Sequence, residues 1–426
     1  MMFEKYDAYK DSGVEWLGNI PKEWSIKPGL VAFSENKRSN KGMVRNTVLS
    51  LSYGKIVIKP EEKLVGLVPE SFETYQLVEP KDIIIRCTDL QNDQTSLRTG
   101  LAKDAGIITS AYLNLKVKRG YSSKYLHYYL HALDTTKVLY KFGSGLRQNL
   151  SFLDFKRLPI LDIPLVQQNQ IACFLDQKTL EIDQAIAIKE QQIALLNERK
   201  QIVIQKAVTQ GLDPNVPMKD SGVEWIGPIP EHWEIKKLKY VLEERSERSR
   251  DGLEPLLMMS QIHGLVVRSE YSDKAEVAAT TVGNKLVYHN DLVFNKLKAH
   301  LGVFFGSVHN FVGSVSPDYA VYKPVKYIEN SKFLELLFRN PLYIKQFILR
   351  SSGIVEGLIR LYTTELFDLK IAIPPNQEQK DILNFVEQQS VKFDEVIENY
   401  LQQIEKLKEY KTTLINDAVT GKIKVA

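Results

Sequence analysis

Two stretches of the chain repeat apolar residues at alternating spacings of four and three, which is the pattern of a helix with one apolar seam. They lie within residues 164–211 and 375–421, and charged residues flank both seams. Because each seam also contains lysine, we expect neither helix to be stable alone and predict that the two helices pack on each other. Helices of about 33 to 40 residues would span roughly 50–60 Å. The seams, related by an offset of 211, are Ile182, Ile186, Lys189, Ile193, Leu196, Lys200, Val203 and Ala207, and Phe393, Ile397, Tyr400, Ile404, Leu407, Lys411, Leu414 and Ala418.

About 135 residues before each helical stretch show a mixed pattern, in which short strand-like runs alternate with turn residues and precede a helix-like stretch. In the first copy these segments are residues 46–58, 81–86 and 111–117, followed by the helical pattern at 122–142. In the second copy they are residues 254–267, 290–297 and 318–324, followed by 331–349. The order is the same while the side chains differ, so we predict a mixed α/β (α+β) fold for both domains.

Each copy begins with a related segment, which we call the leading motif. Residues 10–27 (KDSGVEWLGNIPKEWSIK) and 219–236 (KDSGVEWIGPIPEHWEIK) agree at 13 of 18 positions. All four tryptophans of the chain lie in these two motifs. Glycine, proline and paired aromatic residues are typical of an ordered loop whose rings pack on the following domain. We interpret the tryptophans as packing anchors; the alternative is a platform for stacking bases.

The composition is that of a globular protein with more than one domain. The 426 residues exceed what one core usually holds, and 44% are hydrophobic. The two cysteines, Cys87 and Cys173, are far apart, so we expect a reducing compartment, no disulfide and no zinc site. The sequence shows neither an apolar run of about 18 residues nor the pattern of a signal peptide, and we therefore expect a cytoplasmic location.

Positive charge is concentrated in the two variable regions. Residues 26–162 carry a net charge of +8 and residues 235–372 carry +4, whereas the remaining segments are acidic. Basic surfaces confined to repeated domains suit contacts with phosphates. On charge alone, ordinary variation of a protein surface is an equally good explanation.

Sequence motifs of catalysis are missing. The chain has no phosphate-binding loop of the Gly-x-x-x-x-Gly-Lys-Ser/Thr type. His127 and His131 share one helical face but lack the His-Glu-x-x-His pattern, so a packed helix face is favoured over a metal site. We therefore predict a binding module that has no metal and is not an enzyme.

Together these segments resemble the DNA-specificity subunit of type I restriction–modification systems. The resemblance rests on SGVEWLGNIPKEW and SGVEWIGPIPEHW, on Ile163-Pro164 with PLVQQNQI and Ile373-Pro374 with PPNQEQKDI, and on the AVTxG end of both helical stretches. It covers essentially the whole chain. One mild departure is Gln167-Gln168 where the family favours Glu-Gln, as in Glu378-Gln379.

The resemblance implies a first target recognition domain at 1–162, a central spacer helix at 163–213, a second recognition domain at 214–372 and a C-terminal spacer helix at 373–426. The two helices would form an antiparallel coiled coil with pseudo-twofold symmetry. Each domain would bind half of a bipartite, asymmetric site on double-stranded DNA, and the helices would dock two modification (methyltransferase) subunits. Adenine methylation with S-adenosylmethionine, and cleavage with ATP and Mg²⁺ by restriction (motor-nuclease) subunits, would belong to the partners.

We predict that polar loops at equivalent places in the two domains contact DNA, since arginine, asparagine and glutamine pair with base edges. In the first domain these include the loop 88–98. The candidate residues are Lys37, Arg38, Arg45, Arg98, Arg147, Gln148 and Asn149, and Arg245, Arg248, Arg250, Asn295, Lys296, Lys298, His300 and Arg360. Tyr112 and Tyr319 are interpreted as packing residues.

Two other classes of function stay open at this point. The first is a fused DNA methyltransferase or nuclease with its own activity, which the missing motifs disfavour. The second is a coiled-coil interaction protein without DNA function, which the basic variable regions disfavour. Turnover by the purified chain would indicate the first alternative, and failure to shift DNA in a gel would indicate the second.

Overall fold

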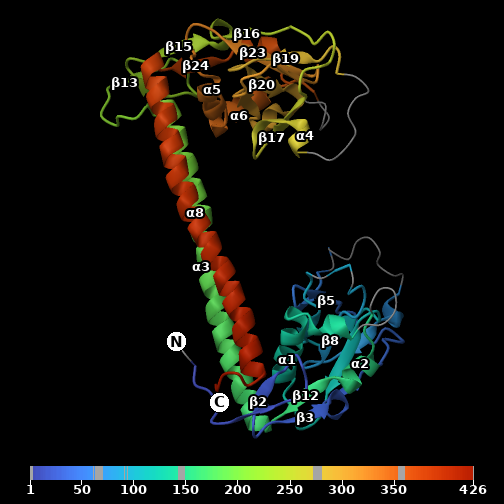
Figure 1. The fold of residues 1–426 in the computed structure, drawn as a ribbon. Helices are drawn as coiled ribbons and strands as arrows, with labels where there is room; N and C mark the ends of the chain where they lie inside the picture. The colour runs from blue at the N-terminus through green and yellow to red at the C-terminus, as the bar shows by residue number, and fades with distance from the viewer. Residues whose placement is uncertain are drawn as a thin grey trace. The chain divides into compact units, whose positions relative to one another are not determined.

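The computed structural model describes residues 3–425 except 61, 63–70, 91, 94, 143–148, 272–280 and 354–359, and describes only the backbone at 299 and 300 (Figure 1). The chain divides into two compact units. Unit 1 consists of Met1–Glu190 and Tyr400–Ala426, and unit 2 of Gln191–Asn399. Unit 1 thus combines the start of the first copy with the end of the second.

Unit 1 is built around a four-stranded antiparallel sheet with the strand order β4-β11-β8-β9. The pairs β1–β2, β5–β6, β7–β10 and β3–β12 surround it. The strands are β1 Tyr9–Asp11, β2 Asn19–Pro21, β3 Ser25–Pro28, β4 Phe33–Glu35, β5 Leu49–Ser52, β6 Lys55–Ile58, β7 Gln76–Val78, β8 Ile83–Ile85, β9 Thr99–Leu101, β10 Gly106–Ile108, β11 Leu113–Val117 and β12 Pro159–Asp162.

Unit 2 repeats this topology strand for strand. Its central sheet has the order β16-β23-β20-β21, and β13–β14, β17–β18, β19–β22 and β15–β24 are the surrounding pairs. The strands are β13 Met218–Asp220, β14 Pro228–Pro230, β15 Glu234–Lys237, β16 Leu242–Glu244, β17 Leu257–Ser260, β18 Gly264–Val267, β19 Lys285–Val287, β20 Leu292–Asn295, β21 Phe304–Gly306, β22 Gly313–Val315, β23 Tyr319–Pro324 and β24 Lys370–Ile373. The duplication seen in the sequence is therefore a duplication of the fold.

Short helices cover the sheets. Unit 1 has α1 Ser123–Thr135 and α2 Phe152–Arg157, and unit 2 has α4 Arg268–Tyr271, α5 Ser331–Phe338, α6 Pro341–Arg350 and α7 Thr363–Phe367. The 3-10 turns are η1 Gly29–Val31, η3 Phe72–Thr74, η4 Val138–Lys141, η5 Leu238–Tyr240 and η6 Lys296–Leu301.

Buried side chains point to both faces of the central strands. In β8, Ile83 and Ile85 belong to the core shared with α1, whereas Ile84 belongs to a smaller core under the β5–β6 hairpin. In β20, Leu292 and Phe294 lie in the main core of unit 2, and Val293 lies in the smaller core of β17–β18. Because side chains alternate between the faces of a strand, an uninterrupted apolar run indicates a strand covered on both sides.

Two long helices, α3 Leu165–Gln210 and α8 Asn376–Val419, contain the predicted seams. At 46 and 44 residues they are longer than the 33 to 40 residues expected. Every seam residue is partly or fully buried. Within unit 1, Lys411 Nζ lies 2.6 Å from Asp183 Oδ1, and Lys189 Nζ donates to Gln403 Oε1 at 2.5 Å. Residue numbers therefore rise along one helix as they fall along the other, so the helices are antiparallel there.

A buried glutamine fixes the start of each long helix to its own unit. Gln168 Nε2 donates to the Ile163 carbonyl at 2.8 Å, and its Oε1 accepts from Ser122 N at 2.8 Å. Gln379 Nε2 donates to the Pro374 carbonyl at 2.9 Å. The neighbouring residue differs between the copies. Gln167 donates to Tyr6 Oη, whereas Glu378 accepts from Trp233 Nε1 at 3.0 Å.

The end of each long helix packs against a leading motif. Trp24 and Trp233 are buried core residues. Gly421, just after α8, has a φ of +75° and lies against Trp24, while Gly211, just after α3, has a φ of +76° and lies against Trp233. A side chain at Gly421 would come within 2.7 Å of both the Trp24 ring and Pro21. Glycine is required there by its left-handed backbone and by the close approach.

Candidate nucleic-acid interface

Two polar loops that were predicted to contact DNA meet in unit 1. Leu150 N donates to the carbonyl of Cys87 at 2.9 Å, and Asn149 Oδ1 accepts from Asp89 N at 3.0 Å. In unit 2, Leu361 N likewise donates to the carbonyl of Lys296 at 3.0 Å. In unit 1 the segment after β8 therefore contacts the segment before α2. In unit 2 the segment after β20 contacts the segment before α7 in the same way.

Arg98 organises the loop 88–98 from inside. Its side chain is fully buried, and its guanidinium donates to the carbonyls of Thr88 at 2.7 Å and Asp89 at 3.1 Å, to Asp93 O, and to Tyr140 Oη at 3.0 Å. The prediction that Arg98 contacts DNA is therefore wrong for this structure, because its donors are used on the loop's own carbonyls.

The loop 88–98 also contains a carboxylate, Asp93, that is held by hydrogen bonds and an ion pair. Hydrogen bonds from Ser96 hold the pKa of Asp93 down at about 2, and Arg86 Nη1 lies 3.0 Å from its carboxylate. Asn149 is exposed beside this loop. Arg147 and Gln148, two further candidates, lie outside the described residues.

The candidates after β4 differ in exposure. Lys37 has 76% of its side chain exposed and pairs with Glu35 at 3.1 Å. Arg38 is half exposed and lies 3.5 Å from Glu79. Arg45 donates to the carbonyl of Val78 and to Glu79, both at 2.9 Å, and the hydrogen bond to Glu79 lowers the pKa of that carboxyl. Arg45 thus joins its loop to β7, while Lys37 and Arg38 face solvent.

In unit 2, too, some candidate residues are held by other side chains and others face solvent. Arg245 has 17% of its side chain exposed and forms a two-pronged ion pair with Asp291, at 2.8 and 3.1 Å, and its guanidinium lies 4.3 Å from the centroid of the Tyr288 ring. Burial raises the pKa of Asp291 against the lowering effect of this arginine. The Arg245 side chain is thus held by Asp291 and Tyr288, and its contact with DNA stays a prediction. Arg248 and Arg250 are exposed, and Arg248 donates to the Gly283 carbonyl at 2.8 Å.

The remaining candidates of unit 2 lie around η6. Asn295 Oδ1 caps Leu297 N at 3.0 Å, and Lys296 lies 3.6 Å from Glu244 with 18% of its side chain exposed. Lys298 is exposed at a kink of this turn. Arg360 lies 3.6 Å from Asp318, and the side chain of His300 is outside the described part of the chain.

His127 and His131 line a cavity of about 580 Å³ within unit 1, together with Tyr128, Asp176 and Lys411. Burial lowers the pKa of both imidazoles to about 4, so they are neutral at physiological pH. Among the residues that the structure describes, no group of three or more His, Cys, Asp or Glu side chains is placed to hold a metal ion.

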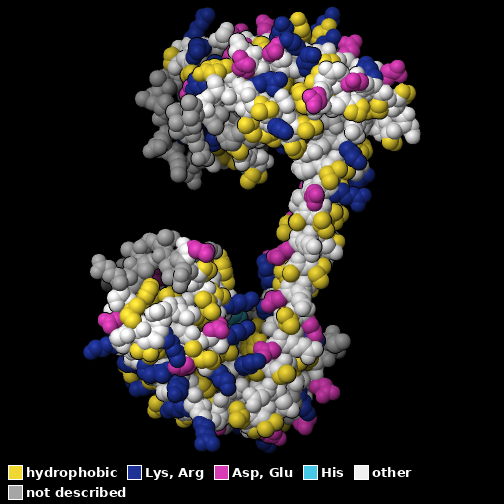
Figure 2. All heavy atoms as spheres, turned by 180° about the vertical axis from the view of Figure 1, so that it is seen from behind, with side chains coloured by type: hydrophobic (Ala, Val, Ile, Leu, Met, Phe, Trp, Pro, Cys, Tyr) yellow, Lys and Arg dark blue, Asp and Glu magenta, His cyan; other side chains and the backbone are white. Residues whose placement is uncertain are grey.

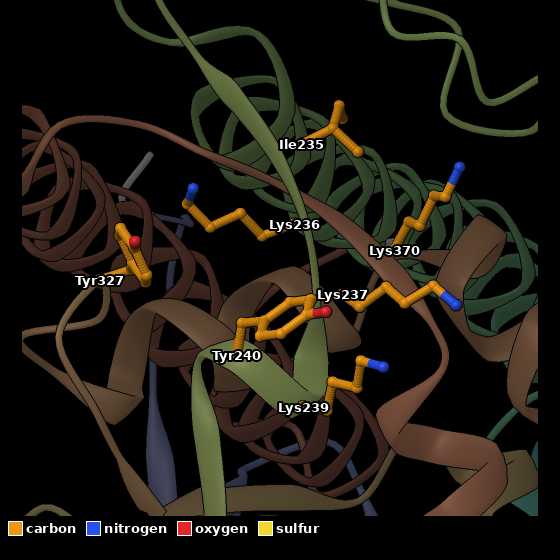
Figure 3. A pocket seen from close by; sticks show the side chains of 7 residues that line it. All are labelled: Ile235, Lys236, Lys237, Lys239, Tyr240, Tyr327 and Lys370. Carbon is orange, nitrogen blue, oxygen red and sulfur yellow. The ribbon is translucent and has the colours of Figure 1, made fainter.

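One basic surface was not singled out from the sequence. Lys236, Lys237, Lys239 and Lys370 line an open groove of about 630 Å³ in unit 2, which we call the lysine groove (Figure 3). Its other walls are Ile235, Tyr240 and Tyr327. The run KKLK at 236–239 was the available signal. Elsewhere, lysine and arginine side chains are interspersed with acidic ones over the visible faces of both units (Figure 2).

Comparison with known proteins identifies the fold. No family model matches the chain, and no curated protein sequence matches it. A solved structure of the HsdS subunit from Thermoanaerobacter tengcongensis is 13% identical, with a TM-score of 0.52 over 95% of this chain and 98% of that chain. A chain in a structure of the complex assembly and conformational transition of the type I R-M system is also 13% identical, with a TM-score of 0.65 over 94% of this chain and 98% of that chain.

The class of protein that this fold defines is a duplicated mixed α/β protein with two long helices. The chain shares it, over nearly its whole length, with the HsdS subunit. No helix within the described ranges is both long and apolar enough to span a bilayer.

Proposed function

We propose that this chain is the DNA-specificity subunit of a type I restriction–modification complex and that it recognises a bipartite, asymmetric DNA site. One observation carries the proposal: the two units agree in every strand pairing, yet the residues on their equivalent loops differ. Two domains with the same strand pairings but different loop residues suit the recognition of two half-sites that differ in sequence.

The exposed basic residues supply the contacts in this proposal. They are Lys37 and Arg38 in unit 1, and Arg248, Arg250 and Lys298 in unit 2. Arg98 and Arg245 act indirectly in this proposal, because they hold in place the loops whose other residues contact DNA. Asn149 and Arg360 lie where the two loops of each unit meet and are candidates for base edges.

The long helices act as the spacer. Lys200 Nζ lies 2.7 Å from Asp394 Oδ2 in unit 2, and Asp183–Lys411 in unit 1 is the same pair at the offset of 211. This equivalence supports a pseudo-twofold, antiparallel coiled coil that sets the gap between half-sites. Two domains on one face of DNA need a separation of about one helical turn, roughly 34–36 Å. The outward faces of the helices would dock two modification subunits.

The chain itself is proposed to be non-catalytic and cytoplasmic. Modification subunits would bring S-adenosylmethionine for adenine methylation, and restriction subunits would bring ATP and Mg²⁺ for cleavage.

Co-expression tests the proposal. The chain is produced with its cognate modification subunit, purified through a tag on this chain, and given plasmid DNA with labelled S-adenosylmethionine. We expect the two proteins to co-purify and to methylate adenine, and the chain alone to transfer no methyl group. Methyl transfer by the chain alone, or none by the complex, contradicts the proposal.

A further inference from the structure

The lysine groove brings like charges into direct opposition. Lys237 on β15 and Lys370 on β24 are cross-strand partners. Like charges directly opposite each other destabilise an antiparallel pair. The equivalent partners in unit 1 are Pro28 and Pro159, so the shared fold does not require charge at this place.

Acidic residues neutralise only part of the groove. Lys236 Nζ lies 2.7 Å from Glu234, and Lys237 pairs with Asp368. Within the part of the chain that the structure describes, no carboxylate lies within 4 Å of the ammonium group of Lys239 or Lys370. The groove therefore keeps a net positive charge.

The side chains are arranged for contact with an extended ligand. Figure 3 shows the ammonium groups of Lys237, Lys239 and Lys370 on one side of the strand, with Lys236 on the other side beside Tyr327. Lys236 Nζ lies 4.2 Å from the centroid of the Tyr327 ring. Tyr240 is 57% exposed between the two groups. At the positions of Lys239 and Tyr240, unit 1 has Leu30 and Val31.

We propose that the lysine groove binds the phosphate backbone of duplex DNA at a place separate from the reading loops of unit 2. This inference rests on the proposed function. Its consequence is an asymmetry between the units, because unit 1 has Pro28, Leu30 and Pro159 at the positions of Lys237, Lys239 and Lys370.

Nucleic acid is favoured over an acidic protein for two reasons. All four basic residues are lysines, which are depleted in protein–protein interfaces where arginine is enriched. Lysine ammonium groups are strongly hydrated point charges that suit phosphates in an open, wet groove.

The salt dependence of DNA binding tests the inference. The intact chain and a variant with Lys236, Lys237, Lys239 and Lys370 each changed to Gln are titrated with a labelled 40-base-pair duplex of arbitrary sequence between 50 and 200 mM salt. The three lysines on one side of the strand, Lys237, Lys239 and Lys370, are counted as phosphate contacts. Their loss lowers the slope of log Kobs against log[salt] by about 2.7, so that affinity falls about 40-fold less over this range than for the intact chain.

A matched control carries the same change of charge outside the groove. Lys10, Lys22, Lys206 and Lys345 are exposed, and all four are changed to Gln. We expect this control to keep most of the wild-type slope, and both variants to keep the wild-type circular dichroism spectrum. Equal slopes for groove variant and wild type, or equal losses in groove variant and control, overturn the inference.

A methylation assay in cells separates this inference from the proposed function. With the modification subunit present, the groove variant should methylate the same sequence as wild type, only more weakly. Absence of any methylated sequence with the wild-type chain would contradict the proposed function. If the groove variant keeps its salt slope but no longer co-purifies with the modification subunit, the groove is a protein-docking surface and the inference is wrong.

Discussion

Lys189 Nζ lies 5.1 Å from the centroid of the Tyr400 ring, and Tyr400 is the residue that occupies the position of Lys189 in the second copy. At this place in unit 1, a residue of α3 therefore contacts the residue of α8 that is its own repeat equivalent. The polar seam positions therefore have partners supplied by the other helix.

Replacing Tyr400 by Lys should destabilise the helix pair. Lys189 would lose its aromatic partner and face a like charge, which should lower the free energy of unfolding by about 1 kcal/mol. Tyr410→Lys is the control, because Tyr410 is 47% exposed on the same helix. Thermal unfolding followed by circular dichroism measures both. An equal shift of Tm in the two variants would contradict a specific role for Tyr400.

The ion pair between Lys200 and Asp394 should make a small but measurable contribution to the free energy of unfolding. Asp394 has 61% of its side chain exposed, so solvent screens the pair, and a coupling of about 0.5 kcal/mol is expected. Lys200→Met, Asp394→Asn and the double variant form a cycle of urea unfolding measurements. The coupling should fall towards zero at 1 M salt. A coupling that is unaffected by salt would show that these variants act through packing.

Replacing Arg98 by Met should be among the most destabilising single changes in unit 1. The loop would lose the hydrogen bonds from the fully buried Arg98 side chain to the carbonyls of Thr88 and Asp89, at a cost of about 3 kcal/mol. Lys37→Met should stay within about 0.5 kcal/mol of wild type, since its side chain is exposed. DNA affinity should fall in both variants, but only Arg98→Met should also lower Tm. Unchanged stability in Arg98→Met would contradict its role as the loop's internal anchor.

Stability should fall as the pH drops from 6.5 towards 4, in part because of His127 and His131. Both are held neutral in the folded state with a pKa of about 4, below the ordinary value of 6.5. The unfolded chain binds more protons in this window, so stability rises with pH there, by about 1 kcal/mol per unit for each histidine. Asp134 opposes this, because burial raises its pKa to about 6.

A variant with both histidines changed to Leu isolates their contribution. Its loss of unfolding free energy between pH 6.5 and 5 should be smaller than that of wild type by about 3 kcal/mol. Unfolding in urea at several pH values measures the difference. Parallel curves for wild type and variant would show that the imidazoles are not buried in the neutral form.

The fold follows largely from local pattern. The segment 46–58 contains the hairpin β5–β6, and 254–267 contains β17–β18. The helix-like stretches were too long. The first stops at Thr135 because Lys137 has a φ of +63°, and the second breaks at Asn340, which caps α6. Both helices are thus interrupted by a residue with non-helical backbone, Lys137 or Asn340, inside an otherwise amphipathic pattern.

The segments that make up unit 1 and the surroundings of the arginines could not be predicted from local sequence. Unit 1 is completed by the end of α8, where Tyr125 Oη donates to the carbonyl of Val419 at 3.0 Å. Arg98 and Arg245 were assigned to DNA because arginine in a polar loop is usually exposed. Their partners, Tyr140 and Asp291, are more than 40 residues away in sequence. Only the tertiary structure brings those partners together.

Methylation sequencing of genomic DNA tests the central claim most directly. Cells without the gene are compared with cells carrying wild type, and with cells carrying Arg248, Arg250 and Lys298 changed to Ala. The account predicts one gapped adenine-methylated sequence that requires the gene, and in the variant a relaxation confined to one half of it. Absence of a gapped sequence, or equal relaxation of both halves, would contradict two units that read separate half-sites.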